Sequence, residues 1–162
     1  MIIDVESGDE CILDNPIYAV HPSGEFALGV NYERLYFCRP GYNYMGVERP
    51  KWDQPMHPKD GIYRVDLDTG ERTQIVATPA VCDVDPKPIF EDNDNWLEHV
   101  MWNPSGTRFA FFHRWETDDG RFETRLYTAD PDGDDLFQFP DSGSYSHMDW
   151  RNDKSFTIWG IK

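Results

Sequence analysis

The stretch that decides the fold is HVMWNPSGTRFAFFH, residues 99–113, because an earlier part of the chain repeats it. IYAVHPSGEFALGVN, residues 17–31, aligns with it without a gap and places one Pro-Ser-Gly turn on the other. In both copies apolar runs flank the turn, which is the pattern of a β-hairpin. A looser third copy, HMDWRNDKSFTIWG at residues 147–160, keeps the opening His-x-x-Trp and replaces the turn by Arg-Asn-Asp.

A second hairpin pattern, built around a glycine in an acidic turn, alternates with the first. GIYRVDLDTGERTQIV at residues 61–76 and RLYTADPDGDDLFQF at residues 125–139 carry it, and MIIDVESGDECIL at residues 1–13 is a third copy. Glycine suits these turns because it adopts the positive φ that tight hairpins often need. Two alternating hairpins predict four-stranded antiparallel sheets that recur along the chain.

Recurring four-stranded sheets are the architecture of a β-propeller, so we expect one all-β domain over residues 1–162. Whole blades are expected at residues 17–76 and 97–139. Residues 1–13 would form strands c and d of a preceding blade, and residues 147–161 strands a and b of a following one. Known propellers have about four to eight blades, so the sequence predicts a segment of a larger propeller. An open array and a dimer that completes a ring are the alternatives, and apolar faces exposed on the segment alone would favour self-association.

The charge balance narrows the possible partners. Thirty acidic residues stand against fifteen basic ones, a formal net charge of −15. Such a field repels nucleic acid and anionic membranes, so we expect neither as a partner, although a local basic cluster could still bind an anion. No run approaches the ~20 apolar residues of a membrane-spanning helix. The N-terminus has no signal-peptide pattern, which favours a cytoplasmic location unless the sequence is a piece of a longer protein.

The turn motifs carry a resemblance to a known family. NPSGTRFAFFH, followed by TRLYTADPDGDDL, resembles the TolB-like propeller repeat, in which a Pro-Asp/Ser-Gly turn precedes an apolar strand. With His99, the HRW at residues 113–115 and the SHMDW at residues 146–150, the wider pattern is similar to bacterial oligogalacturonate-lyase-type propellers. That family binds a divalent metal through a close cluster of histidine and glutamine. We find no such cluster here, because no glutamine of the chain lies near a pair of histidines.

Four basic side chains near one end of the hairpins are not explained by the repeat. His99 and His147 open strand a in neighbouring units, while His113 and Arg114 close strand b. Across a hairpin the opening and closing residues are partners, so we expect all four to gather at one end of the sheets. Structural histidines bonded to backbone groups are the alternative. Because imidazole suits divalent metals, His99, His113 and His147 are also a possible site for a metal such as Mn.

The long connection at residues 31–60 is expected to leave from the same end. It carries Arg39, Tyr42, Tyr44 and Trp52. Aromatic rings stack on sugars and guanidinium groups grip carboxylates, so Arg39, Tyr42 and Trp52, together with His113, are candidates for binding an acidic sugar. A loop that packs on its neighbours through its own aromatics is the alternative.

Two functions follow as hypotheses. The first is an oligouronate lyase acting by β-elimination. In it Arg114 or Arg39 neutralises the substrate carboxylate, His99 or His147 is the base, and Tyr44 or Tyr42 is the acid. The alternative is a non-catalytic TolB-like propeller that binds a glycan or a protein on the same face, with structural histidines. The fold alone does not decide between them, because proteins with this repeat have several functions.

Overall fold

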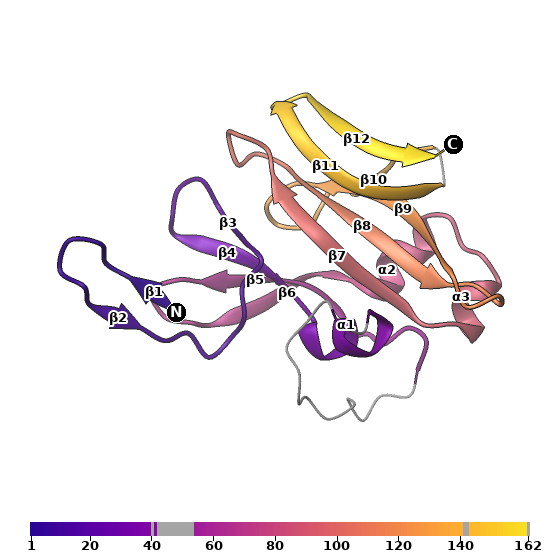
Figure 1. Cartoon of the computed structure of the whole chain (residues 1–162), viewed down its shortest axis with the longest axis horizontal. Helices are drawn as coiled ribbons and strands as arrows, with labels where there is room; N and C mark the ends of the chain where they lie inside the picture. The colour runs from indigo at the N-terminus through magenta and orange to yellow at the C-terminus, as the bar shows by residue number, and fades with distance from the viewer. Residues whose placement is uncertain (40, 42–53, 141–142, 162) are drawn as a thin grey trace.

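The computed structural model describes residues 1–39, 41, 54–140 and 143–161, and most of them lie in antiparallel sheets (Figure 1). The first four-stranded sheet contains β3 (Ala19–Val20), β4 (Phe26–Val30), β5 (Gly61–Asp66) and β6 (Arg72–Ala77). The second contains β7 (Asn95–Trp102), β8 (Phe109–Glu116), β9 (Phe122–Ala129) and β10 (Phe137–Gln138). In both sheets each strand pairs with its neighbour in the chain, so the predicted four-stranded antiparallel sheets are confirmed.

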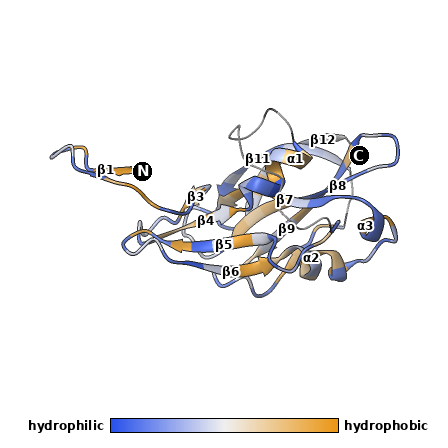
Figure 2. Ribbon diagram, turned by 90° about the horizontal axis from the view of Figure 1, so that it is seen from below, coloured by the Kyte–Doolittle hydropathy of each residue, from blue (hydrophilic) through white to orange (hydrophobic). Residues whose placement is uncertain are grey.

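A two-stranded hairpin flanks the pair of sheets on each side. The N-terminal one contains β1 (Ile2–Ile3) and β2 (Glu10–Cys11), and the C-terminal one contains β11 (Ser144–Asn152) and β12 (Ser155–Ile161). Figure 2 shows β1 at the end of an arm that projects away from the sheets. The described residues form no closed ring of sheets.

The chain is mostly β, as expected, and three short helices connect its strands. They are α1 (Tyr32–Cys38), α2 (Thr78–Val84) and α3 (Ile89–Asp92). The side chain of Asn31 caps α1 by accepting the Arg34 N–H at 3.1 Å, and a proline in the first turn of α2 presets the helical φ. None of the helices in the described ranges is long and apolar enough to cross a membrane.

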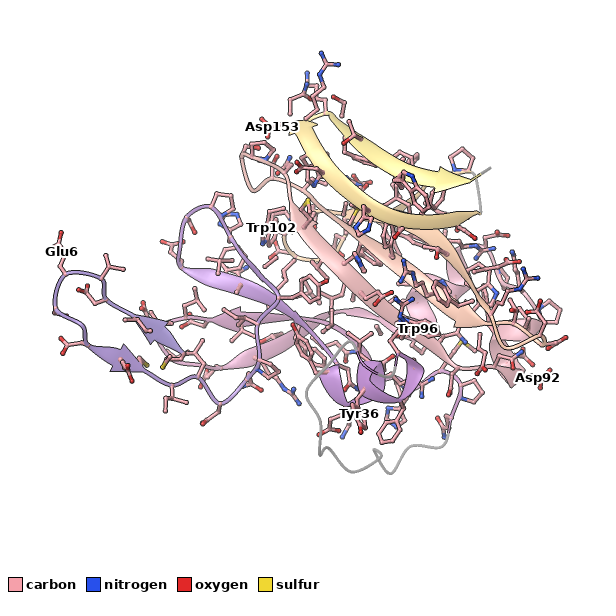
Figure 3. The ribbon with its side chains drawn as sticks, in the orientation of Figure 1. Glu6, Tyr36, Asp92, Trp96, Trp102 and Asp153 are labelled. Carbon is pink, nitrogen blue, oxygen red and sulfur yellow. The ribbon has the colours of Figure 1, made fainter. Side chains whose placement is uncertain are left out.

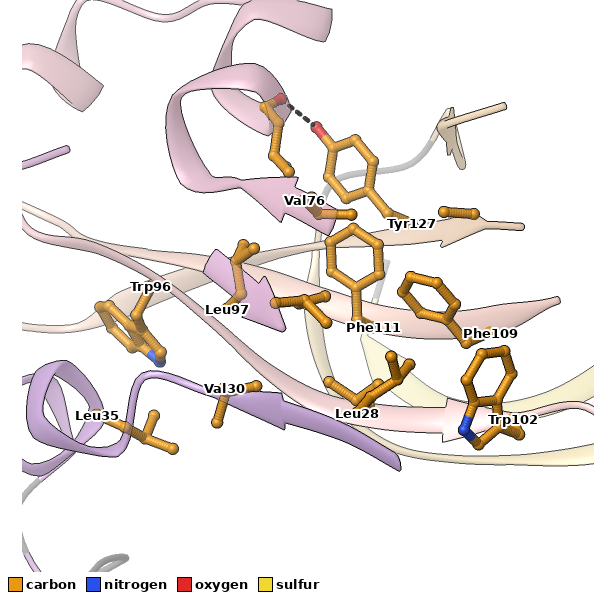
Figure 4. Close-up of a cluster of buried hydrophobic side chains, with 14 of the residues drawn as sticks. Leu28, Val30, Leu35, Val76, Trp96, Leu97, Trp102, Phe109, Phe111 and Tyr127 are labelled. Atoms are coloured by element: carbon orange, nitrogen blue, oxygen red, sulfur yellow. Dashed lines mark hydrogen bonds between the residues drawn. The ribbon is translucent and has the colours of Figure 1, made fainter. Parts of the chain in front are cut away.

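The two four-stranded sheets and the C-terminal hairpin stack face to face in chain order. Because side chains alternate along a strand, Phe109 and Phe111 of β8 face the first sheet, while Ala110 and Phe112 face the C-terminal hairpin. The first interface is the main core, and Figure 4 shows how its aromatic and aliphatic side chains fill the space between the sheets. The second interface contains Ala110, Phe112, Leu126 and Met148, with Tyr145, Trp150 and Phe156 packed against them. As a result β8 is buried on both faces.

The same tryptophan contact joins the second sheet to the first and the C-terminal hairpin to the second sheet. The indole N–H of Trp102 donates to the Ala19 carbonyl at 3.2 Å, and that of Trp150 donates to the Met101 carbonyl at 3.1 Å. Ala19 and Met101 hold the same position in the sequence repeat, as do the two tryptophans. Figure 3 shows Trp102 on the side of β7 that faces the first sheet. These two tryptophans therefore pack between neighbouring sheets.

The Pro-Ser-Gly turns also meet their neighbours. His21 in the first turn places its Nε2 3.0 Å from the Gly106 carbonyl oxygen in the second. In the next unit the Asp153 carboxylate accepts the Ser105 N–H at 2.8 Å. The repeat in the sequence is therefore also a repeat in the contacts between turns.

Candidate functional site

A buried ion pair lies at the centre of the candidate site. Glu98 of β7 and Arg114 of β8 form it, and their side chains are 1% and 3% exposed. The Arg114 guanidinium also donates to the Thr124 hydroxyl at 3.1 Å and to the Tyr145 carbonyl at 2.8 Å. Arg114 thus links three strands and fastens β11 to the second sheet.

His99 sits beside this pair in a β-bulge. The pairing of β7 with β8 shifts register between Glu98 and Met101, and His99 has a φ of +56°. Its Nδ1 lies 3.8 Å from a Glu98 carboxylate oxygen, and its ring packs 5.2 Å from that of Phe112. A positive φ is uncommon for a residue other than glycine, and such conformations cluster at functional sites.

Two further basic side chains complete the cluster. Helix α1 is docked onto the start of β7 by Arg34, whose guanidinium donates to the Asn95 carbonyl at 3.0 Å. The α1 C-cap residue, Arg39, thereby lies with its guanidinium 4.4 Å from the centre of the Phe122 ring. Arg114 lies 4.8 Å from the same ring. His147 is exposed on β11 and close enough to affect the titration of His99.

The local field is positive although the chain as a whole is strongly acidic. Burial and, to a lesser extent, the charges of Arg114, Arg39 and His147 together lower the pKa of His99 to about 4. His99 is therefore neutral at pH 7. We call Arg39, His99, Arg114 and His147 the basic cluster. These four candidates from the sequence come together.

His113 does not join the basic cluster, and the prediction that it would is wrong. It pairs with Leu97, and even without the bulge the register would place it opposite Glu98 instead of His99. It also points to the opposite face from Arg114, as consecutive residues of a strand do. There it is fully buried, with its Nε2 2.9 Å from the Asn95 side-chain oxygen, and burial lowers its pKa to about 3.

This placement also corrects the expected metal site. His99 and His147 are separated from His113 by the second sheet, so the three imidazoles cannot share an ion. Within the described ranges no three His, Cys, Asp or Glu side chains gather in a way that could hold a metal. The residues present there do not fit the divalent metal that the resemblance implied.

Around His113 the structure holds a Cys–His–Asn arrangement that sequence reasoning missed. The Cys82 sulfur lies 3.6 Å from His113 Nε2 and 3.7 Å from the Asn95 side-chain oxygen. Burial raises the pKa of the Cys82 thiol to about 12, so it stays protonated at neutral pH. All three residues are sealed from solvent, and they serve to fix α2 on the second sheet.

A cleft of about 480 Å³ adjoins the basic cluster. Its lining residues are Ile89, Thr117, Asp118, Asp119, Arg121, Phe122, Glu123 and Ser144. Phe122 is shared, since its ring also contacts the guanidinium groups of Arg39 and Arg114. The volume lies in the range of small-ligand pockets. The carboxylates that line the cleft are acceptors suited to hydroxyl donors.

Three candidates from the sequence, Tyr42, Tyr44 and Trp52, fall outside the described residues. Glu98 and Thr124 were missed. A signal for Glu98 was present, because one acid in the apolar strand NWLEHVMW and one arginine in FAFFHRW predict an ion pair across the hairpin. Comparisons with protein-family models, with curated proteins and with solved structures find no match to this chain, so its function is argued from the site.

Proposed function

We propose that the chain is a β-propeller segment that binds an acidic oligosaccharide at the basic cluster and does not cleave it. Three repeated features support a propeller: strands that pair in chain order, sheets that stack in chain order, and the tryptophan bond to the preceding sheet. Each is expected where blades follow one another around an axis.

The observation that carries the binding proposal is the basic cluster beside the Phe122 ring, in a chain of net charge −15. Arg39 and His147 are the members that a sugar carboxylate would meet, since His147 is exposed and Arg39 half-buried. Phe122 would offer its ring to the apolar face of the sugar. The cleft carboxylates, Asp118 and Asp119 among them, would accept bonds from the sugar hydroxyls.

Two features favour binding over β-elimination. Arg114 already donates to Glu98, Thr124 and the Tyr145 carbonyl, so it would have to give up those bonds to neutralise a substrate carboxylate. A general base works best when its pKa lies near the working pH, and the pKa of His99 is about 4. The lyase hypothesis is therefore the second candidate.

Calorimetry of the whole chain with oligogalacturonate tests the proposal. We expect binding, and we expect the fully methyl-esterified oligosaccharide, which has the same chain without the charge, to bind at least tenfold more weakly, because a hydrogen bond to a charged group contributes roughly 1.5–3 kcal/mol. Arg39→Gln and His147→Ala should each weaken oligogalacturonate binding. Arg72→Gln, which alters an exposed arginine of the first sheet, is the matched control and should leave binding unchanged.

The same samples decide between the two functions. Incubation with oligogalacturonate should yield no unsaturated product by ultraviolet absorbance, with or without added Mn²⁺. Accumulation of that product would establish the lyase instead. Equal affinity for the acid and its ester would contradict a site for carboxylate.

A further inference from the structure

The two flanking hairpins are complementary halves of one four-stranded sheet. In the N-terminal hairpin the Gly8 N–H donates to the Asp4 carbonyl at 2.9 Å, and in the β5–β6 hairpin the Gly70 N–H donates to the Asp66 carbonyl at 2.9 Å. The aspartate side chains of both turns accept N–H groups two and three residues further on. The β1–β2 hairpin is thus built like the last two strands of a whole sheet.

The C-terminal hairpin is built like the first two strands. Trp150 pairs with Phe156 across β11 and β12, as Trp102 pairs with Phe109 across β7 and β8. In the second sheet, the edge of β8 that faces away from β7 pairs with β9. The corresponding edge of β12, which faces away from β11, pairs with no strand of the described residues. An unpaired edge offers a row of N–H and carbonyl groups to an added strand.

The two halves cannot meet within one molecule in this arrangement, because they lie at opposite ends of the structure (Figure 1). Both expose large apolar side chains: Ile3 is 49% exposed on β1, and Trp159 is 63% exposed on β12. Such side chains are buried when the missing half is present. A second copy carries both halves and can supply to each the half that it lacks.

Charge selects head-to-tail pairing over pairing of like ends. Residues 1–14 contain five acidic residues and no lysine or arginine, so two N-terminal hairpins repel each other. Residues 144–161 balance two acidic residues with two basic ones, Arg151 and Lys154, both exposed. The acidic hairpin of one copy therefore meets the least acidic end of another.

We propose that β1 of one copy pairs antiparallel with β12 of a second copy and completes a four-stranded sheet across the two molecules. The whole sheets give the register. Ala27 pairs with Val65 and Leu28 with Arg64 in the first, and Phe109 pairs with Ala129 in the second. We transfer these pairings to β12 and β1 by superposing the equivalent turns. Phe156 of one copy then lies opposite Ile3 of the partner copy, and Thr157 lies opposite Ile2.

Disulfide trapping tests this register. In a Cys11→Ser background, copies carrying Ile2→Cys are mixed with copies carrying Thr157→Cys under mild oxidation. Directly opposed residues of antiparallel strands lie about 4.5–5.5 Å apart between Cα atoms, within the reach of a disulfide. We expect a covalent dimer from this mixture. Copies carrying Val5→Cys, in the turn of the same hairpin, should give none with Thr157→Cys, and equal trapping of both would overturn the proposal.

Sedimentation equilibrium over a concentration series tests the association itself. The chain of 18.9 kDa should form dimers or larger head-to-tail assemblies. Ile3→Lys should weaken the association about tenfold or more, because a buried isoleucine contributes roughly 1.5–3 kcal/mol. Val84→Lys, at a residue 45% exposed on α2, is the matched control and should leave it unchanged. A chain that stays monomeric throughout, or equal effects of both lysines, would overturn the proposal. Far-ultraviolet circular dichroism confirms that each variant is folded.

Discussion

His113 and Arg114 are consecutive in β8, yet each holds a different neighbour against the second sheet. His113 lies against Cys82 of α2 on one face. Arg114 donates to the Tyr145 carbonyl of β11 on the other. One strand therefore carries a neutral buried contact on one side and a buried charge on the other, and the two respond differently to substitution and to pH.

Glu98→Gln should destabilise the fold by about 3 kcal/mol, because it leaves the Arg114 charge buried without its carboxylate. Urea unfolding followed by tryptophan fluorescence measures this loss. The double variant Glu98→Leu with Arg114→Met removes both charges and should recover much of the stability. A double variant that is no more stable than Glu98→Gln would show that the ion pair is not the source of the effect.

Gly106→Ala should destabilise the chain more than Gly120→Ala does. Both glycines have a φ above +70°, so both substitutions strain the backbone, by roughly 1 kcal/mol. Only at Gly106 would the added Cβ also lie 2.2 Å from His21 Nε2, in the contact between the two turns. The melting temperatures of the two variants separate the clash from the strain, and equal losses would rule out a tight contact between turns.

Acid should destabilise the fold through its buried histidines. The pKa of His99 is lowered to about 4 and that of His113 to about 3, against an ordinary value of 6.5. As pH falls below about 6.5 the unfolded chain takes up these protons first, so the free energy of unfolding decreases down to pH 4 and below. Urea titrations across this range measure the slope, and His99→Gln should make it shallower. If the slope is the same in His99→Gln as in the unchanged chain, the lowered pKa does not belong to His99.

Asp60 should act in the opposite direction. It is buried, it accepts the Thr78 hydroxyl at 2.8 Å, and burial raises its pKa to about 6. Its contribution to stability is complete below pH 3.8 and is lost as pH rises through 6, because the folded protein then holds a buried carboxylate. The change in the free energy of unfolding caused by Asp60→Asn should therefore be more favourable at pH 8 than at pH 4. The same urea series at both pH values checks this, and an effect independent of pH would contradict it.

The three cysteines should react at very different rates. Cys11 is exposed, whereas burial raises the pKa of both Cys38 and Cys82 to about 12. Because the thiolate is the reactive form, a thiol reagent should modify Cys11 first and the others only after denaturation. Mass spectrometry of the labelled peptides measures the order. Rapid labelling of Cys82 in the folded protein would show that the Cys–His–Asn arrangement is open to solvent.

The sheets could be predicted from the sequence because turn residues repeat at fixed positions. Gly24 and Gly106 both have positive φ in the first hairpin pattern, as Gly70 and Gly133 do in the second. The helices could not, because α1 and α2 have only seven residues each, too few for a helical period to stand out. The available signals were Asn31, the N-cap of α1, and the proline in the first turn of α2.

The candidate site was predicted in part. Placing His99 and His147 at equivalent positions, with Arg114 at the end of the paired strand, locates most of the basic cluster. The bulge at His99 could not be foreseen, because nothing in EHVMW specifies the extra residue that shifts the register. The alternation along β8 alone places His113 on the face opposite Arg114.

The bond from each repeat-equivalent tryptophan to the preceding sheet also bears on the order in which the protein assembles during synthesis. Trp102 bonds to Ala19, and Trp150 bonds to Met101, so each new strand docks on a partner that the ribosome has already released. Every sheet pairs strands that are neighbours in the chain, which keeps the loops to be closed comparatively short. The chain can therefore grow sheet by sheet from its N-terminal side, each finished sheet serving as the template for the next.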